Sequence, residues 1–387
     1  MESSPKNQAR RHFLTGIVGA AMVALGACTT APAPQGPVTV EPAPTTPDTP
    51  TPTPVAERNG IAVLVPLTGD NQAVGNSIAN AAKMALIDSE VDTLRLTIYD
   101  TAGPGGAAAA AQQAIAAGDK LILGPLLAEN VRAVGPIAER ADVPVIAFSN
   151  DEGVAGDNVY IMGFTPTQSI ARSVAYASKN GVSTYAGLIP NSLYGQRAIN
   201  SLIVSVDDNG GRLAALETYE RSRSALETAI GKINARDGID AVVIGDGGSV
   251  AKMVAPRLEH GGWKIGNELW AAERDLGQTA ALRGAIYSAV PDRMFTTLSS
   301  RYRSRYGAAP YRLASLGYDA VLLAARISRD WRPGARFPAS MLKADDGFGG
   351  VDGIFRFDSD NVAVRALEVR RVTPGGTEVL DPAATRF

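Results

Sequence analysis

The stretch Ile61-Ala-Val-Leu-Val-Pro-Leu-Thr-Gly69 decides the fold class of this chain. Its first five residues are all apolar and rich in β-branched side chains, which is typical of a strand buried on both faces of a sheet. The Pro-Leu-Thr-Gly that follows predicts a turn, and residues 73–87 then carry apolar side chains at helical spacing. A short apolar strand followed by a helix predicts a parallel sheet covered by helices.

The same alternation continues along the chain and starts again after Phe164. The expected strands are 94–99, 121–123, 143–148, 185–189, 212–219, 241–244 and 268–272. The expected helices are an alanine-rich one that ends near 117, then 128–140, 168–180, 195–208, 225–235 and 250–259. This order predicts an α/β protein with two doubly wound parallel-sheet lobes and an interlobe cleft at the carboxyl ends of the strands.

The part of the chain after residue 285 is not expected to form a third domain. It predicts a strand at 285–290, helices at 294–306 and 313–327, and two antiparallel strands at 353–357 and 362–372. The second of these helices is too apolar to stand alone. We therefore expect the chain to cross back, with a first lobe at about 59–163 and 286–338 and a second at about 164–285 and 339–387.

Composition and charge exclude several classes of function. The 387 residues have a net charge of −2 and are 45% hydrophobic, which favours a globular protein and argues against nucleic-acid binding. The single cysteine excludes an intramolecular disulfide and a cysteine-based zinc site. The sequence has neither a Gly-x-Ser-x-Gly elbow nor a Gly-x-x-x-x-Gly-Lys loop. We therefore expect no catalysis, no cofactor and no metal.

Residues 1–28 have the organisation of an export signal. Three basic residues precede an apolar stretch at 13–24 that is too short to span a membrane. Leu25-Gly-Ala-Cys28 resembles a bacterial lipobox, which implies that Cys28 becomes the lipidated first residue of the mature chain. The alternative is an ordinary cleaved signal with an incidental cysteine. Residues 10–14, Arg-Arg-His-Phe-Leu, resemble a twin-arginine motif, which implies export in the folded state.

Residues 29–58 are expected to form a Pro/Thr-rich disordered tether. The segment 29–57 holds nine of the 24 prolines and has little apolar side chain to bury. Such a segment is either a passive stalk or a spacer that lets the domain reach away from the membrane. Thr29 follows the cysteine in place of Asp, which in lipoproteins of the enteric kind implies release to the outer membrane.

Several motifs, taken in order, resemble those of the type I periplasmic binding proteins of the leucine/isoleucine/valine-binding kind. The resemblance covers residues 59–387, and the fold it implies is the two-lobed one predicted above. The motifs are Val65-Pro-Leu-Thr-Gly69, Leu123-Gly-Pro125, Val143-Pro-Val-Ile146, Ser192-Leu-Tyr-Gly195, Leu316-Gly-Tyr-Asp-Ala320, Phe348-Gly-Gly-Val-Asp-Gly353 and Phe355-Arg-Phe-Asp358.

Within that superfamily, Gly124-Pro-Leu-Leu-Ala-Glu-Asn-Val131 is most similar to the penicillin-binding protein activators. That resemblance implies an outer-membrane lipoprotein whose binding-protein-like domain contacts a peptidoglycan synthase. In amino-acid-binding relatives, a Glu at the place of Glu273 pairs with the ligand ammonium, and a hydroxyl residue in the loop after 121–123 takes the carboxylate. Here Ala128 and Glu129 replace the hydroxyl residues, which argues against a standard amino-acid pocket.

The candidate cleft residues follow predicted strands or begin predicted helices, where a ligand can approach the backbone. They are Thr68, Leu126, Leu127, Ser149, Asn150, Phe164, Tyr194, Asp246 and Glu273. Glu273 is equally compatible with a salt bridge to Arg274 or to a neighbouring base. For Tyr194 and Phe164, we favour packing at the hinge or in the core over contact with a ligand.

Four other motifs have a structural interpretation that we favour. His260 is expected to end a helix, Gly245-Asp-Gly-Gly-Ser249 to form a tight turn in preference to an anion site, and Asp358-Ser-Asp-Asn361 to form a strand turn in preference to a calcium site. The basic and aromatic residues of 301–312 are expected to form a solvated helix face, with a docking patch for an acidic partner or an anionic glycan as the alternative.

The sequence thus predicts a non-catalytic, lipid-anchored periplasmic protein. The resemblance implies that it activates a peptidoglycan synthase. The alternative is a substrate-binding receptor of an amino-acid-type ABC transporter with a small amino-acid-like ligand. An apolar or filled cleft would favour the activator, whereas a polar pocket of converging Ser, Asn and Glu groups would favour the receptor.

Overall fold

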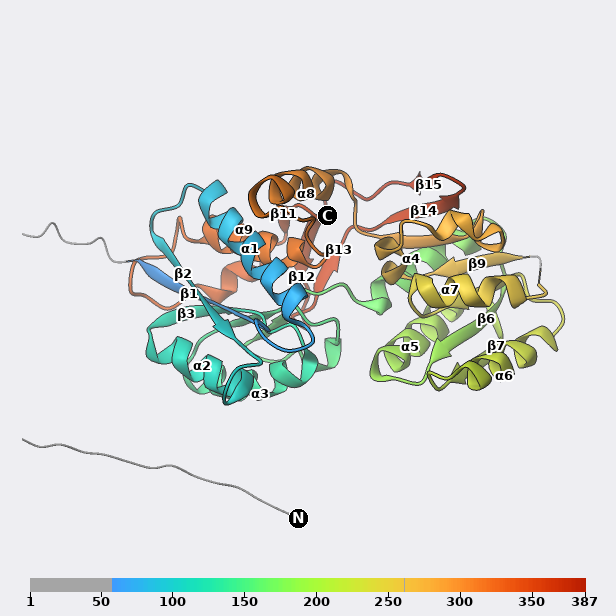
Figure 1. Ribbon diagram of the computed structural model, residues 1–387, viewed down its shortest axis with the longest axis horizontal. Coiled ribbons are helices and arrows are strands. Elements are labelled where there is room, and N and C mark those ends of the chain that lie inside the picture. The colour runs from blue at the N-terminus through green and yellow to red at the C-terminus, as the bar shows by residue number, and fades with distance from the viewer. Residues whose placement is uncertain (1–57, 261) are drawn as a thin grey trace, which may run out of the picture. The chain divides into compact units, whose positions relative to one another are not determined.

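The computed structural model describes residues 58–260 and 262–387 (Figure 1). The predicted export signal, Cys28, Thr29 and the tether up to residue 57 lie outside the described residues. No helix among the described residues is both long and apolar enough to cross a membrane.

The first lobe is built on a five-stranded parallel sheet with the order β2-β1-β3-β4-β5. Its strands are β1 (Asn59–Val65), β2 (Leu94–Asp100), β3 (Asp119–Leu123), β4 (Val145–Ala147) and β5 (Val159–Ile161). Helices α1 (Gln72–Asp88) and α9 (Ala314–Ile327) cover one face, and α2 (Gly106–Ala116) and α3 (Ala128–Arg140) cover the other. In β1, Ile61, Val63 and Val65 contact the first pair of helices, whereas Ala62 and Leu64 contact the second. Burial on both faces explains why this strand is wholly apolar.

The second lobe contains a seven-stranded sheet with the order β15-β14-β10-β9-β8-β6-β7. The parallel strands are β6 (Thr184–Pro190), β7 (Arg212–Tyr219), β8 (Ala241–Ile244), β9 (Trp263–Gly266) and β10 (Ile286–Ala289). Two antiparallel strands, β14 (Glu368–Thr373) and β15 (Gly376–Asp381), complete the edge. Helices α4 (Pro166–Lys179) and α5 (Leu193–Asp208) cover one face, and α6 (Arg223–Asn234) and α7 (Gly248–Val254) cover the other.

The chain crosses between the lobes later than the sequence suggests. Strand β10 was expected in the first lobe, but it lies between β9 and β14 in the second sheet. Residues 339–365 were expected in the second lobe, but they pack into the core of the first. They form η6 (Ala339–Lys343), β11 (Phe348–Gly350), β12 (Gly353–Phe357) and β13 (Ala363–Arg365), preceded by α8 (Arg293–Tyr306) and α9. A fully buried apolar strand fits either sheet, so its composition alone could not assign β10 to a lobe.

Three predicted elements take a different form. The segment Glu268–Ala272 is a 3₁₀ helix, η3, and not a strand, because the Asn267 side chain accepts a hydrogen bond from the Leu269 N–H and Trp270 turns into the core. The helix expected at 250–259 ends at Val254 and continues as η2 (Ala255–Arg257), which contains Pro256. The strand expected at 362–372 divides into β13 and β14, which belong to different lobes.

Candidate ligand cleft between the lobes

A chamber of about 440 Å³ lies between the two lobes. The first lobe contributes the start of α1, the loops that follow β3, β4 and β5 and the segment before α9, and the second lobe contributes η3. Most of its wall is apolar, formed by Val74, Leu126, Leu127, Phe148, Phe164, Leu269, Ala271, Ala272 and Leu313. The polar or amphipathic residues of the wall are Asn71, Asn150, Glu268, Tyr311 and Arg312. Such a chamber suits a ligand with a largely apolar body or a partner side chain.

Glu268 is the acidic group of this chamber and comes from the second lobe. Its Oε1 accepts a hydrogen bond from the Tyr194 hydroxyl at 2.8 Å, and among the described residues its buried Oε2 has no partner. Burial raises the pKa of Glu268 from 4.5 to about 7. The carboxyl group is therefore partly protonated at neutral pH and can both donate and accept a hydrogen bond.

Arg312 is the basic group of the chamber and comes from the first lobe. Its Nη1 lies 2.6 Å from a carboxylate oxygen of the fully buried Asp352, and its guanidinium stacks 4.2 Å from the centroid of the Phe295 ring. Its Nε lies 3.6 Å from a carboxylate oxygen of Asp292, and within residues 58–260 and 262–387 its Nη2 finds no hydrogen-bond acceptor. Arg312 therefore has the Nη2 donor to offer to a group that enters the chamber.

A smaller cavity of about 30 Å³ is lined in part by the same residues as the chamber. Phe164, Glu268, Ala271 and Arg312 line both, and the smaller cavity adds Thr165 and Arg365 among others. Arg365 is buried, donates to the Met162 carbonyl at 2.6 Å and leaves Nε and Nη1 without an acceptor in the described part of the chain. This volume has room for about one water molecule, which these polar groups would bind.

The chamber brings together four of the predicted cleft residues, Leu126, Leu127, Asn150 and Phe164. Tyr194 does not line the chamber, but its hydroxyl donates a hydrogen bond to Glu268, which does. The sequence did not single out Glu268, because the apolar residues after it predicted a strand. It noted Arg312 only as part of the basic and aromatic segment.

The other four predicted residues lie outside the chamber wall. Thr68 donates to Asp100 at 2.7 Å, and the buried Ser149 hydroxyl accepts from the Asp151 N–H at 3.1 Å. Asp246 is buried in a separate pocket of the second lobe. Glu273 forms a salt bridge of 2.9 Å with Lys252, so the neighbouring base is a lysine.

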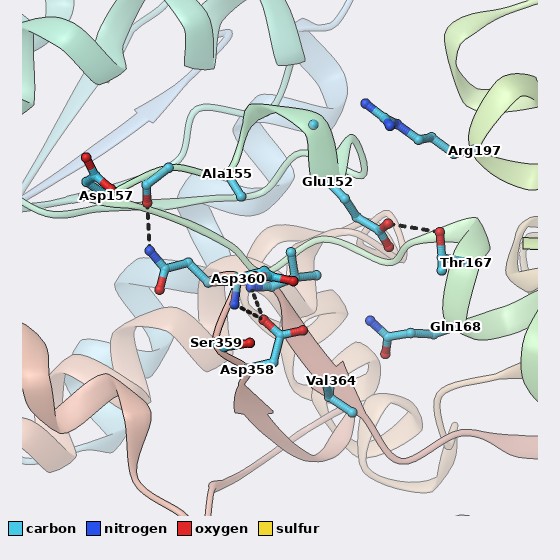
Figure 2. Close-up of a pocket in the computed structure, with 14 residues that line it drawn as sticks. Glu152, Ala155, Asp157, Thr167, Gln168, Arg197, Asp358, Ser359, Asp360 and Val364 are labelled. Carbon is cyan, nitrogen blue, oxygen red and sulfur yellow. Dashed lines mark hydrogen bonds between the residues drawn. The ribbon is translucent and has the colours of Figure 1, made fainter. Parts of the chain in front are cut away.

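A polar opening of about 590 Å³ lies where the lobes meet on another side (Figure 2). The Thr167 hydroxyl, from the second lobe, donates to Glu152 at 2.9 Å, as Figure 2 shows. Next to it, Asp151 accepts from Arg132 of its own lobe at 2.7 Å and from Arg197 of the other lobe at 3.2 Å. The Asp358 carboxylate in this opening is already bonded to the backbone N–H groups of its own turn. The Thr167–Glu152 and Arg197–Asp151 contacts connect the two lobes.

Two parallel-sheet lobes, joined by three chain crossings around a chamber, define the class of two-lobed solute-binding proteins. The sequence profile of the periplasmic binding protein family matches residues 60–377, and the chain belongs to this family. This membership fits a periplasmic location, and the predicted α/β architecture with two parallel-sheet lobes is confirmed.

Three proteins illustrate what the chain is similar to. The penicillin-binding protein activator LpoA of Photobacterium profundum is 26% identical over 184 residues, which are 46% of this chain and 29% of that protein. A putative branched-chain amino acid ABC transporter protein of Rhodospirillum rubrum has a TM-score of 0.74 and 19% identity over 84% of this chain and all of that one. The C-domain of LpoA from Haemophilus influenzae, described as a regulator of PBP1A, has a TM-score of 0.64 and 18% identity over 83% of this chain and all of that domain.

A protein of Rickettsia prowazekii is also similar, with 26% identity over 45% of this chain. The matched segments cover 47% of that protein and 29% of the Photobacterium profundum activator, so this chain matches less than half of each. Solved structures at these levels of identity establish the fold. They include both transporter binding proteins and a regulator, so the fold is compatible with both predicted functions.

Proposed function

We propose that the protein is a non-catalytic periplasmic lipoprotein that activates a peptidoglycan synthase by direct contact. The observation that carries this proposal is the apolar wall of the interlobe chamber. The loop after β3 places Leu126 and Leu127 in that wall, and Ala128 and the exposed Glu129 follow. This loop offers no hydroxyl side chain to a ligand carboxylate, so a standard amino-acid ligand would lose hydrogen bonds that it makes in water.

Three further observations support the proposal. The similarity to the LpoA of Photobacterium profundum extends over 46% of the chain. The lipobox-like segment ending at Cys28 and the proline-rich segment after it would let a lipid-anchored domain reach a partner at a distance from an outer membrane. The twin-arginine-like segment would route the folded protein to the periplasm.

The direct test is an assay of glycan-strand synthesis and peptide crosslinking with purified synthases of the source organism. We expect the full chain to raise the activity of one synthase several-fold at micromolar concentration, and to be retained by that synthase in a pull-down. Because the proposed mechanism is direct contact, the activation should saturate at one copy of this chain per synthase.

Cys28→Ser is the matched control for the anchor. This variant should activate the synthase in solution as the unaltered chain does, but it should fail to restore cell-wall drug resistance in cells that lack the protein. If no purified synthase binds or responds, and if loss of the protein leaves drug sensitivity unchanged, the proposal is wrong.

The second candidate is a substrate-binding receptor of an amino-acid-type ABC transporter. Glu268 and Arg312 favour it, because they reach the same chamber from opposite lobes and both leave polar atoms unpartnered among the described residues. A carboxyl group and a guanidinium are the groups that would pair with the ammonium and the carboxylate of an amino acid.

Thermal unfolding of the full chain with millimolar branched-chain amino acids tests the receptor. Binding to the native state must raise the midpoint temperature. If the receptor hypothesis holds, Glu268→Gln should abolish the rise, since the amide keeps the bond to Tyr194 but cannot pair with an ammonium group. The absence of any rise with the unaltered chain would rule out these ligands.

A further inference from the structure

A separate pocket of about 340 Å³ lies entirely within the second lobe. It opens at the carboxyl ends of β7 and β8, beside the first turn of α6, and shares no residue with the interlobe chamber. Three arginines, Arg221, Arg223 and Arg257, form its rim. We call it the arginine-rimmed pocket. Neither proposed function uses it.

The rim carries more positive charge than its neighbours neutralise. Arg221 pairs at 3.1 Å with Asp246, whose buried carboxylate also accepts from the Tyr219 hydroxyl at 2.6 Å. Arg223 pairs at 2.9 Å with Glu227, but both side chains are largely exposed, so the pair is weak.

The third arginine of the rim, Arg257, makes no ion pair with any residue of 58–260 or 262–387. The first turn of α6, whose Ala225 N–H is capped by Ser222, adds the positive end of a helix dipole. The rim therefore attracts acidic groups.

The floor of the pocket is apolar. Leu226 and Val250 contribute to it, and Met253 stands beside them with 52% of its surface exposed. Methionine adapts its shape to different apolar partners, and both methionine and arginine are enriched in protein interfaces. The pocket therefore matches a bulky apolar side chain with acidic groups around it.

The exposure of the rim favours a macromolecular partner over a free small molecule. The side chains of Arg221 and Arg223 are 68% and 81% exposed. Small-molecule sites usually enclose most of the surface of their ligand, and this rim does not. A protein surface would cover the arginines and exclude water from their charge pairs, which strengthens those pairs.

We propose that the arginine-rimmed pocket docks an acidic segment of a partner protein, with one bulky apolar side chain of that segment on the floor formed by Leu226 and Val250. The proposal is independent of the chamber and of lobe movement, because all lining residues belong to one lobe. The proposal can therefore be tested independently of the synthase and transporter hypotheses.

The test is fluorescence anisotropy of a labelled peptide with one phenylalanine flanked by glutamates, titrated with the full chain. We expect saturable binding that weakens at least tenfold in Arg257→Glu and in Met253→Asp, both of which alter exposed side chains. Replacing the peptide phenylalanine by alanine should weaken binding about fivefold. Raising the salt concentration should weaken binding as well, because the rim contacts are ionic.

Arg236→Glu is the matched control, since Arg236 is an exposed arginine of the same lobe outside the pocket. It should bind the peptide as the unaltered chain does. Equal weakening in Arg236→Glu and Arg257→Glu would reveal unspecific attraction and overturn the proposal. So would equal binding of the alanine peptide, displacement of the peptide by acetate or benzoate at micromolar concentration, or the absence of any binding.

Discussion

At the scale of the residue, Glu268 has the property with the clearest consequence. Its pKa is raised from 4.5 to about 7 by burial. Between these two pH values the folded chain holds a proton that the unfolded chain has lost, so the free energy of unfolding decreases as the pH rises through this window. At higher pH the fold contains a buried carboxylate that lacks a partner for Oε2 among the described residues.

Glu268→Gln should therefore stabilise the protein at pH 8, by about 1–2 kcal/mol, and change little at pH 4. Urea unfolding at the two pH values measures this difference. Glu129→Gln, which alters an exposed glutamate, is the control and should leave both values unchanged. Equal effects of Glu268→Gln at pH 4 and pH 8 would contradict the assignment.

A second residue-scale prediction concerns Gly350, which belongs to one of the family-like motifs. A Cβ at this position would lie 2.4 Å from Oδ2 of Asp319, a buried carboxylate that accepts bonds from the Val351 and Asp352 N–H groups. Gly350→Ala should cost about 1–3 kcal/mol of unfolding free energy. Gly349→Ala meets no atom within 4 Å and should cost much less in the same measurement.

Gly350 and Asp319 show what the motifs could reveal from sequence. They identified the family because they build the junction between α9 and β11, and that junction is structural. The chamber residues were harder to predict. Glu268 and Arg312 are 44 positions apart in the sequence and line the same chamber from different lobes, so no local pattern relates them.

At the scale of the element, the order of strands and helices could be predicted because buried strands of parallel sheets are continuous apolar runs. The prediction of a strand at Glu268–Ala272 was wrong for the same reason. Its Leu-Trp-Ala-Ala is as apolar as a strand, yet it forms η3, whose Trp270 fills the core and donates its indole N–H to the Asp246 carbonyl at 3.0 Å. Apolar composition indicates burial, not the form of the backbone.

Trp270 anchors η3, and η3 places Glu268 in the chamber. Loss of Trp270 should therefore lower the stability of the fold and disturb the chamber. Trp270 is completely buried, with its ring centroid 6.1 Å from that of Tyr287. Trp270→Ala should cost about 3–5 kcal/mol in chemical unfolding. Trp263→Ala, which removes a partly exposed tryptophan of the same lobe, should cost clearly less. Similar losses in the two variants would contradict the anchoring role of Trp270.

At the scale of the whole molecule, the two-lobed plan followed from the restart of the strand and helix pattern after Phe164. The points where the chain crosses back could not be predicted, because nothing in residues 286–289 and 348–365 indicates which of the two lobes they join. The relative position of the lobes depends on contacts such as Asp151 with Arg197, and these join side chains on loops and helices that no periodicity relates.

The Asp151–Arg197 pair leads to a prediction about lobe closure. The Arg197 side chain is 33% exposed, so the pair should contribute about 0.5–1 kcal/mol to the arrangement of the two lobes in this structure, which we take as the closed one. Arg197→Ala should then raise the open population about two- to fivefold, seen as longer distances between spin labels on α2 and α6 in a Cys28→Ser background. Arg132→Ala removes the other partner of Asp151 but acts within one lobe, so it should leave the distances unchanged. If both variants lengthen the distances equally, Asp151 acts through the local structure of its own loop, and the contact between the lobes is not what holds them closed.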